Sequence, residues 1–290
     1  MLAFIKSQKA YFYLLLLCSV GIGLQIVLYK IVIIALFLQW LLGADFKNKF
    51  LKLKDNNYSL GLIMLYLLYA ISLFWSENMT VALNDLTLKS PLLILPLVIA
   101  TQERLSHKQF DKLLLTFTVT SLGLNLVCLA DAYLSYLESH ELHHLYYHSL
   151  TVNMHTAYQA MFTCFSILSL IYLSVKEKSR YYWLLSFAIF LQLIFVLLLS
   201  SRMQILIMAV LVPVYLIAKY LREKRLYLGI IYTLVIFGLA RLIMSAPSSL
   251  NNRYNQTVNH ISNIGVDNGS SDARKFIWKN GLEVIKENWL

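Results

Sequence analysis

The stretch YWLLSFAIFLQLIFVLLLSS, from Tyr182 to Ser201, decides the fold class because it contains no charged residue. About 20 predominantly apolar residues are enough to cross a bilayer as an α-helix, which satisfies its own backbone hydrogen bonds in lipid. A second apolar run, Met203 to Ala218, begins directly after Arg202. We therefore predict two membrane spans joined by a short connection that carries a permanent positive charge.

The rest of the chain has the same character. Of its 290 residues, 59% are hydrophobic and 14% are charged, and the mean hydropathy is +0.63. These values are far from those of a soluble globular domain. The sequence predicts an all-α, polytopic membrane helix bundle over residues 1–244. Its nine expected spans cover approximately residues 10–23, 26–43, 58–75, 80–100, 112–136, 153–175, 181–200, 203–220 and 226–244.

The formal net charge of +10 reports membrane topology rather than nucleic-acid binding. Lys and Arg gather at the N-terminus and in every second connection, near residues 47–54, 104–112, 176–180 and 219–225. Cytoplasmic loops carry such an excess. We therefore predict a cytoplasmic N-terminus, an external segment from Ser245 onward, and no nucleic-acid partner. The alternate connections carry only Arg202, so this cation lies on the predicted outer side.

Residues 245–290 differ in composition from the bundle, being polar and rich in asparagine. A capping signal at Ser271-Asp272 and the apolar positions that follow predict an amphipathic helix near residues 273–287. We interpret the segment as the start of a periplasmic loop. Since the chain stops at Leu290 without a further span, the sequence also predicts a partial member of a longer protein.

Arg202 and Arg274 are the leading candidate site residues. A guanidinium group can bind phosphate through two parallel charge-assisted hydrogen bonds. The alternative role for Arg202 is that of an interfacial residue that reaches the lipid headgroups. The alternative for Arg274 is a solvated side chain paired with Asp272. The position of Arg202 against the charge bias favours a functional role.

Other polar residues lie inside or beside predicted spans. Lys89 is intramembrane, one turn after Asp85, so it either lines a polar wall or forms a structural i, i+4 ion pair. His155 and Tyr158, at the outer start of the sixth span, either hydrogen-bond a polar substrate or anchor the helix. Lys30 and Arg241 also lie within predicted spans.

The loop before the sixth span is rich in histidine and glutamate. Zinc needs three or four convergent ligands, but the spacing in this loop matches no specific template, and its tyrosines are typical of an interfacial aromatic belt. We therefore assign no metal ligands from the sequence. The loop residues in question are Glu138, His140, Glu141, His143, His144 and His148.

Together these features resemble the bacterial O-antigen ligase and O-antigen polymerase superfamily of integral-membrane glycosyltransferases. The matching motifs are the Ser200-Ser201-Arg202 junction before a short apolar span, the outer His155 and Tyr158 region, and a loop signature. That signature runs Arg274-Lys275-Phe276-Ile277-Trp278, then Gly281-Leu282, then Ile285-Lys286-Glu287-Asn288.

The resemblance implies a fold of about a dozen helices with a large periplasmic loop, acting in the bacterial inner (cytoplasmic) membrane. It implies transfer of an undecaprenyl-diphosphate-linked glycan to lipid A-core or another glycan acceptor, among membrane lipids and with no cofactor. Arg202 and Arg274 would bind the diphosphate, with Lys89 assisting and His155 and Tyr158 lining the site. The family's acceptor-activating histidine is expected beyond Leu290, so no catalytic residue is assigned here.

Two alternatives stay open within this sequence. A transporter or flippase would use Lys30, Lys89 and Arg241 to line a path, and would favour an internal repeat that the sequence does not show. A non-catalytic, truncated membrane protein is the other alternative. Within the superfamily, the sequence does not separate ligase from polymerase.

Overall fold

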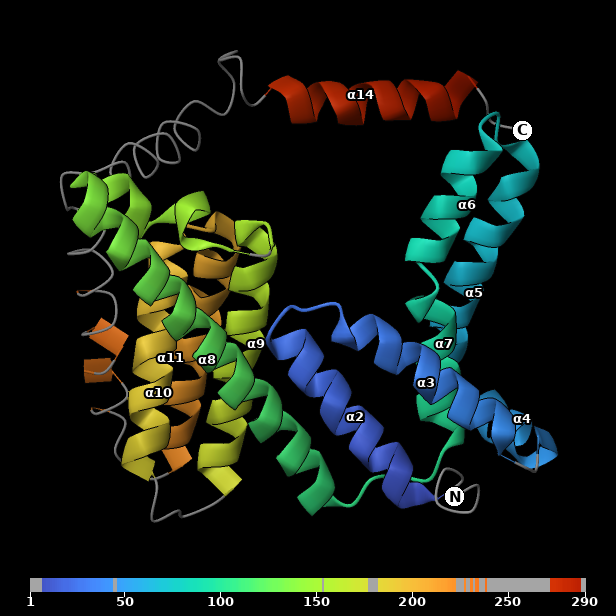
Figure 1. Ribbon diagram of the computed structural model, residues 1–290, viewed down its shortest axis with the longest axis horizontal. Helices are drawn as coiled ribbons and strands as arrows, with labels where there is room; N and C mark the ends of the chain where they lie inside the picture. Colours follow the sequence, from blue (N-terminus) through green and yellow to red (C-terminus); the bar gives the residue numbers. More distant parts are fainter. Residues whose placement is uncertain are drawn as a thin grey trace. The chain divides into compact units, whose positions relative to one another are not determined.

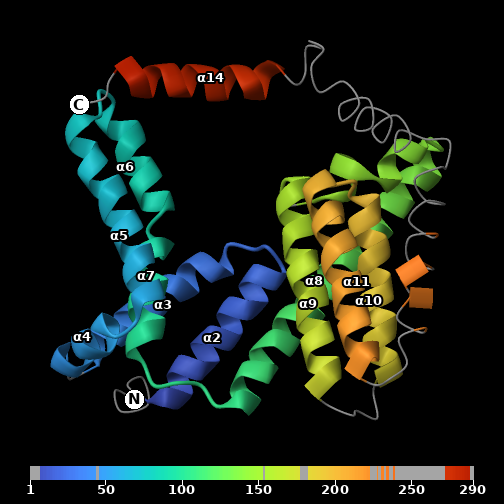
Figure 2. The same ribbon diagram turned by 180° about the vertical axis from the view of Figure 1, so that it is seen from behind.

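A computed structural model of the chain describes residues 7–43, 46–152, 154–176, 182–222 and 272–287, together with 227, 230–231, 233–234 and 238. Throughout these residues the regular elements are helices, as Figures 1 and 2 show from opposite sides. The prediction of an all-α fold is confirmed.

The first part of the chain forms mostly short and medium helices. They are α2 (Gln8–Gly23), α3 (Leu28–Leu42), α4 (Phe46–Lys54), α5 (Asn57–Ser72), the 3-10 turn η1 (Leu73–Trp75), α6 (Met79–Leu88) and α7 (Pro91–Thr101). Side-chain caps fix several starts: Ser7 accepts a hydrogen bond from the N–H of Ala10 at 3.2 Å, and Asn56 and Asn78 act in the same way. Helices α2 and α3 lie side by side (Figure 1) and share a hydrophobic core with Val98 of α7.

The later part contains the longer helices. They are α8 (His107–Ser139), α9 (Thr156–Lys176), α10 (Tyr182–Leu198), α11 (Arg202–Arg222) and α14 (Asp272–Glu287), with the 3-10 turns η2 (Leu142–Leu145) and η3 (Tyr147–Leu150) between α8 and α9. The chain divides into two compact units. Unit 1 comprises Met1–Asp131 and Thr151–Val196, and unit 2 comprises Ala132–Leu150 and Leu197–Leu290.

The helices coincide with the predicted spans as far as residue 220. The span predicted at 226–244 lies largely outside the described residues. By length and composition, four described stretches can cross a membrane, namely Asn57–Trp75, Met79–Thr101, His107–Ser139 and Thr156–Ser174, and the bent pair α3 and α4 would make a fifth. A polytopic helical membrane protein therefore agrees with the structure, while the number of spans and their topology stay predictions.

The surface of α5 supports a lipid environment. Leu62, Met64, Leu65, Leu67 and Leu68 are all exposed, and only 6% of the Asn57–Trp75 window is buried within the protein. A contiguous apolar patch of this kind is unfavourable in water, but it costs nothing against lipid tails. The apolar side chains of this segment are therefore suited to contact with lipid rather than to a protein core.

Close packing between α2 and α8 depends on Gly23. A Cβ atom added there would collide with Thr120 Oγ1 and lie 2.9 Å from Thr120 Cβ and 3.1 Å from the carbonyl oxygen of Phe117. Thr120 cannot easily move aside, because its hydroxyl donates to the carbonyl of Thr116 at 2.9 Å within its own helix and its χ1 is stiff. The absence of a side chain at Gly23 therefore sets the approach of the two helices.

We expect Gly23→Ala to destabilise the protein by about 1–3 kcal/mol, the usual cost of overpacking. The matched control is Gly61→Ala in α5, where an added Cβ meets nothing within 4 Å and helix propensity favours alanine. Cys18, Cys128 and Cys164 are free and buried, so a thiol-reactive fluorophore can follow thermal unfolding in detergent. A melting temperature for Gly23→Ala equal to that of Gly61→Ala would contradict this packing account.

Candidate functional site

The joint between α10 and α11 is a tight turn of two serines. After α10 ends, Ser200 adopts a left-handed backbone with φ 50°, a common way to terminate a helix. Its N–H donates to the carbonyl three residues earlier at 3.0 Å. The hydroxyl of Ser201 then donates to Oε1 of Gln204, the third residue of α11. Ser-x-x-Gln is a capping pattern, and it makes Arg202 the first helical residue.

Both leading arginines occupy the first turn of a helix. Arg202 is the first residue of α11, and Arg274 is the third residue of α14. The N–H groups of a first turn have no partner within the helix and carry partial positive charge. A cation there is disfavoured alone, but a bound anion would interact with the guanidinium and the N–H groups together. The side chains of both arginines lie outside the described part of the chain.

Lys89 lies at the break between α6 and α7, inside the Met79–Thr101 stretch. Its Nζ is 3.1 Å from Oδ2 of Asp85, one turn earlier, and 4.7 Å from the centroid of the Tyr69 ring on α5. The ion pair predicted as the structural alternative is therefore present. A cation at the C-terminal end of α6 is also favoured by the helix dipole.

His155 and Tyr158 lie together at the start of α9. The Nδ1 atom of His155 accepts a hydrogen bond from the N–H of Ala157 at 3.3 Å, which makes it a capping group. The two rings meet edge to face with centroids 6.4 Å apart, and Tyr158 is 59% exposed. Anchoring of the helix is therefore observed, and both residues are exposed.

The five predicted site residues do not belong to one unit. Lys89, His155 and Tyr158 are in unit 1, whereas Arg202 and Arg274 are in unit 2. Convergence of all five on one substrate therefore stays a prediction. Of the transporter candidates, Lys30 lies exposed in the first turn of α3, and Arg241 is outside the described residues.

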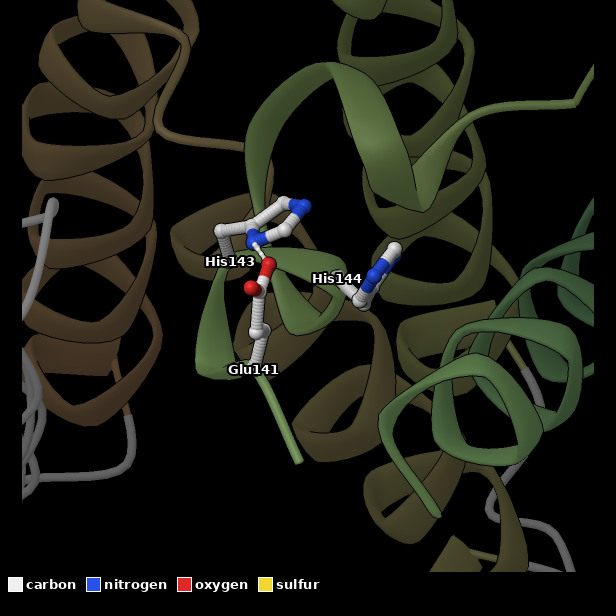
Figure 3. A group of neighbouring side chains, drawn as sticks. All are labelled: Glu141, His143 and His144. Carbon is white, nitrogen blue, oxygen red and sulfur yellow. Dashed lines mark ion pairs between the residues drawn. The ribbon is translucent and has the colours of Figure 1, made fainter. Parts of the chain in front are cut away.

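The histidine-rich loop brings three side chains together. Glu141, His143 and His144 each offer a ligand atom, and these atoms all lie within 4.8 Å of one another. Figure 3 shows His143 and His144 on the short η2 turn and Glu141 directly before it. Nδ1 of His143 lies 2.8 Å from Oε2 of Glu141. Sequence spacing alone did not predict this convergence, because it depends on a 3-10 turn.

Buried polar side chains of α8, α9 and α10 form a polar seam that was not predicted from the sequence. Gln159 of α9 donates to Oδ1 of Asn125 at 3.3 Å and approaches Sγ of Cys128 at 3.4 Å, both on α8. Asn125 in turn donates to Oγ1 of Thr163 at 3.1 Å. The α9 face that carries the seam continues with Ser166, which accepts a hydrogen bond from Gln192 of α10 at 2.9 Å. These side chains are almost fully buried.

The signal for the seam was present in the sequence. Thr156, Gln159, Thr163 and Ser166 recur every three or four residues, which places them on one face of a helix. Polar side chains on such a face commonly join helices within a membrane, where lipid offers no hydrogen bonds. The seam therefore positions α8, α9 and α10 relative to one another within unit 1.

A mixed-charge pocket lies elsewhere, at connections predicted to be cytoplasmic. It is lined by residues of the α4 to α5 and α7 to α8 connections and of the adjoining helix ends, including Lys52, Asp55, Glu103 and Arg104. None of the predicted site residues is among its lining residues in the described part of the chain. This pocket therefore gives no support to the predicted site.

The C-terminal part of the chain is similar to a known protein family. A protein-family model described as O-Antigen ligase matches residues 187–290, a little more than a third of the chain. No curated protein and no solved structure matches. The matched stretch contains Arg202 and Arg274, whereas Lys89, His155 and Tyr158 precede it.

Proposed function

The family match supports membership of the O-antigen ligase and polymerase superfamily, and on that premise we propose that the chain transfers a lipid-linked glycan. The donor is an undecaprenyl-diphosphate-linked glycan, and the acceptor is a hydroxyl of lipid A-core or another glycan. The reaction takes place at the periplasmic face of the bacterial inner membrane. Within the superfamily, we propose the ligase reaction, and polymerisation is the alternative.

One observation supports the proposal: both arginines lie within the matched stretch, and each belongs to the first turn of a helix. A guanidinium beside unpaired backbone N–H groups is suited to a diphosphate, because charge and hydrogen-bond donors point to the same anion. Two such helix starts would bind the two phosphates of one donor. Arg202 follows an apolar run, and Arg274 lies in the predicted external segment. Both positions suit a donor that is anchored in the membrane.

The bond changes define what the arginines must do. The acceptor oxygen attacks the anomeric carbon from the face opposite the diphosphate, while the bond from that carbon to the diphosphate oxygen breaks. Undecaprenyl diphosphate leaves with the bonding electrons, so negative charge grows on the diphosphate. Arg202 and Arg274 stabilise this charge at fixed positions. The hydroxyl proton passes to a general base, which the superfamily resemblance assigns to a loop histidine.

Lys89, His155 and Tyr158 have supporting roles in this proposal. Lys89 would assist diphosphate binding, although its ammonium is already paired with Asp85. His155 and Tyr158 would contact polar groups of the substrate from the start of α9, where Tyr158 is exposed. Because the charge neutralisation comes from arginine, the reaction needs no cofactor.

Deletion of the gene in its bacterial host tests the proposed function. We expect undecaprenyl-diphosphate-linked glycan to accumulate and the acceptor to lose its glycan, with both changes reversed by the full-length gene. Mass spectrometry of the lipid-linked pool and electrophoresis of the acceptor measure the two products.

The chain length of the accumulated glycan separates the two activities. A missing ligase leaves long glycans on the lipid carrier and an unmodified acceptor, which is the result we expect. A missing polymerase leaves acceptors that carry a single repeat. A deletion strain with normal levels of both lipid-linked glycan and modified acceptor would overturn the proposed function.

A further inference from the structure

The turn after α8 has a defined backbone. His140 adopts a left-handed conformation with φ 55°, and its N–H donates to the carbonyl of Tyr136 at 2.7 Å. Oγ of Ser139 accepts a hydrogen bond from the N–H of Glu141 at 3.2 Å. These bonds end α8 and redirect the chain into η2, so Glu141 directly precedes a tight 3-10 turn.

Buried side chains fix the chain on the C-terminal side of the same turn. Tyr146 is 9% exposed and Leu150 is fully buried. By contrast, Glu141 and His143 are exposed, and His144 is half-buried. The backbone is thus anchored, while the three polar side chains can rotate at the surface.

The three side chains are close enough to share one ion. The carboxylate of Glu141 lies 2.8 Å from Nδ1 of His143, and the rings of His143 and His144 are 4.1 Å apart between centroids (Figure 3). Tetrahedral bonds of about 2.0–2.2 Å from zinc to nitrogen and oxygen put the ligand atoms about 3.3–3.6 Å apart, which is closer than the observed limit of 4.8 Å. Small side-chain rotations would supply that contraction.

We propose that Glu141, His143 and His144 bind a divalent transition-metal ion of the Zn²⁺ class. Two imidazole nitrogens and one carboxylate oxygen are a donor set that suits zinc, whereas Mg²⁺ and Ca²⁺ prefer oxygen ligands. Solvent exposure of Glu141 and His143 leaves room for water as the fourth ligand. The ion would link Glu141 to the two histidines of η2 and so make the turn more rigid. This proposal does not depend on the proposed transfer reaction.

Metal binding by the purified full-length protein tests the proposal. After removal of bound metals with a chelator, Zn²⁺ is titrated in detergent against a chromophoric chelator, with Co²⁺ absorption as a second reading of coordination. We expect one equivalent to bind with Co²⁺ bands typical of tetrahedral coordination. His143→Ala and His144→Ala should each weaken binding by more than about 100-fold, since even the loss of an outer-shell partner costs 10- to 100-fold. Glu141→Gln should weaken it too.

His107→Ala is the matched control, because His107 is an exposed histidine at the start of α8 and outside the cluster. It should leave the affinity unchanged. Unchanged affinity in both His143→Ala and His144→Ala would overturn the proposal, as would the absence of stoichiometric binding. Either result is independent of glycan transfer, because no donor or acceptor is present in the titration.

Discussion

Arg202→Ala and Arg274→Ala are each expected to lower glycan transfer by about 10²- to 10³-fold, the usual cost of removing one fixed donor to a developing anion. Both residues lie in the first turn of a helix within the family match, where guanidinium and backbone N–H groups can bind one diphosphate. Rates of transfer by the purified full-length protein, with lipid-linked glycan and acceptor, measure the effect. Lysine at either position should restore only part of the rate, because it keeps the charge but loses the planar fork.

The control for these substitutions is Arg222→Ala. Arg222 is the last residue of α11, at the opposite end of the helix from Arg202, and the charge pattern predicts that it lies on the cytoplasmic side. Its removal should leave transfer within about twofold of the parent rate, since no proposed diphosphate contact is lost. Equal losses in Arg222→Ala and Arg202→Ala would show that general membrane charge, rather than a diphosphate site, explains the effect.

Gln159→Leu is expected to destabilise the helix bundle by about 1–3 kcal/mol, because it leaves buried polar partners without their hydrogen bond. Gln159 donates to Asn125, which lies on α8 and is almost fully buried. Leucine has a similar size but no donor. Thermal unfolding in detergent, followed through the buried cysteines, measures the change.

A double-mutant cycle with Asn125→Leu tests whether the two amides act as one network. The double variant should lose less stability than the two single variants together, because each single variant already removes the shared bond. Asn84→Leu is the chemical control, since Asn84 is an exposed amide on α6. Strict additivity, or an equal loss in Asn84→Leu, would contradict the network.

Helix positions could be predicted because lipid imposes a simple rule. Apolar runs long enough to cross the membrane must be helical, so the runs around Asn57–Trp75 and Thr156–Ser174 fell on helices. The single span predicted at residues 80–100 is broken into α6 and α7, because Pro91 starts a new helix and cannot continue the preceding one. The charge pattern adds a topology prediction that a structure without a membrane does not test.

The candidate site was predictable only in its residue types. The Ser-Ser-Arg joint and the loop signature pointed to the superfamily that the match over residues 187–290 supports. The sequence offered two roles each for Lys89 and His155 and did not choose between them. In the structure Lys89 pairs with Asp85, and His155 caps α9. The convergence of Glu141, His143 and His144 depends on a 3-10 turn, whose geometry leaves no periodic pattern in the sequence.

The most direct test of the central claim is a reconstitution of the full-length protein in liposomes with lipid-linked glycan and acceptor. The measurement compares the glycan joined to the acceptor with the undecaprenyl diphosphate released. A transferase releases one lipid diphosphate for every glycan transferred, and Arg202→Ala with Arg274→Ala should abolish both products together. Movement of intact lipid-linked glycan across the bilayer, without transfer or release, would contradict the account and favour a flippase.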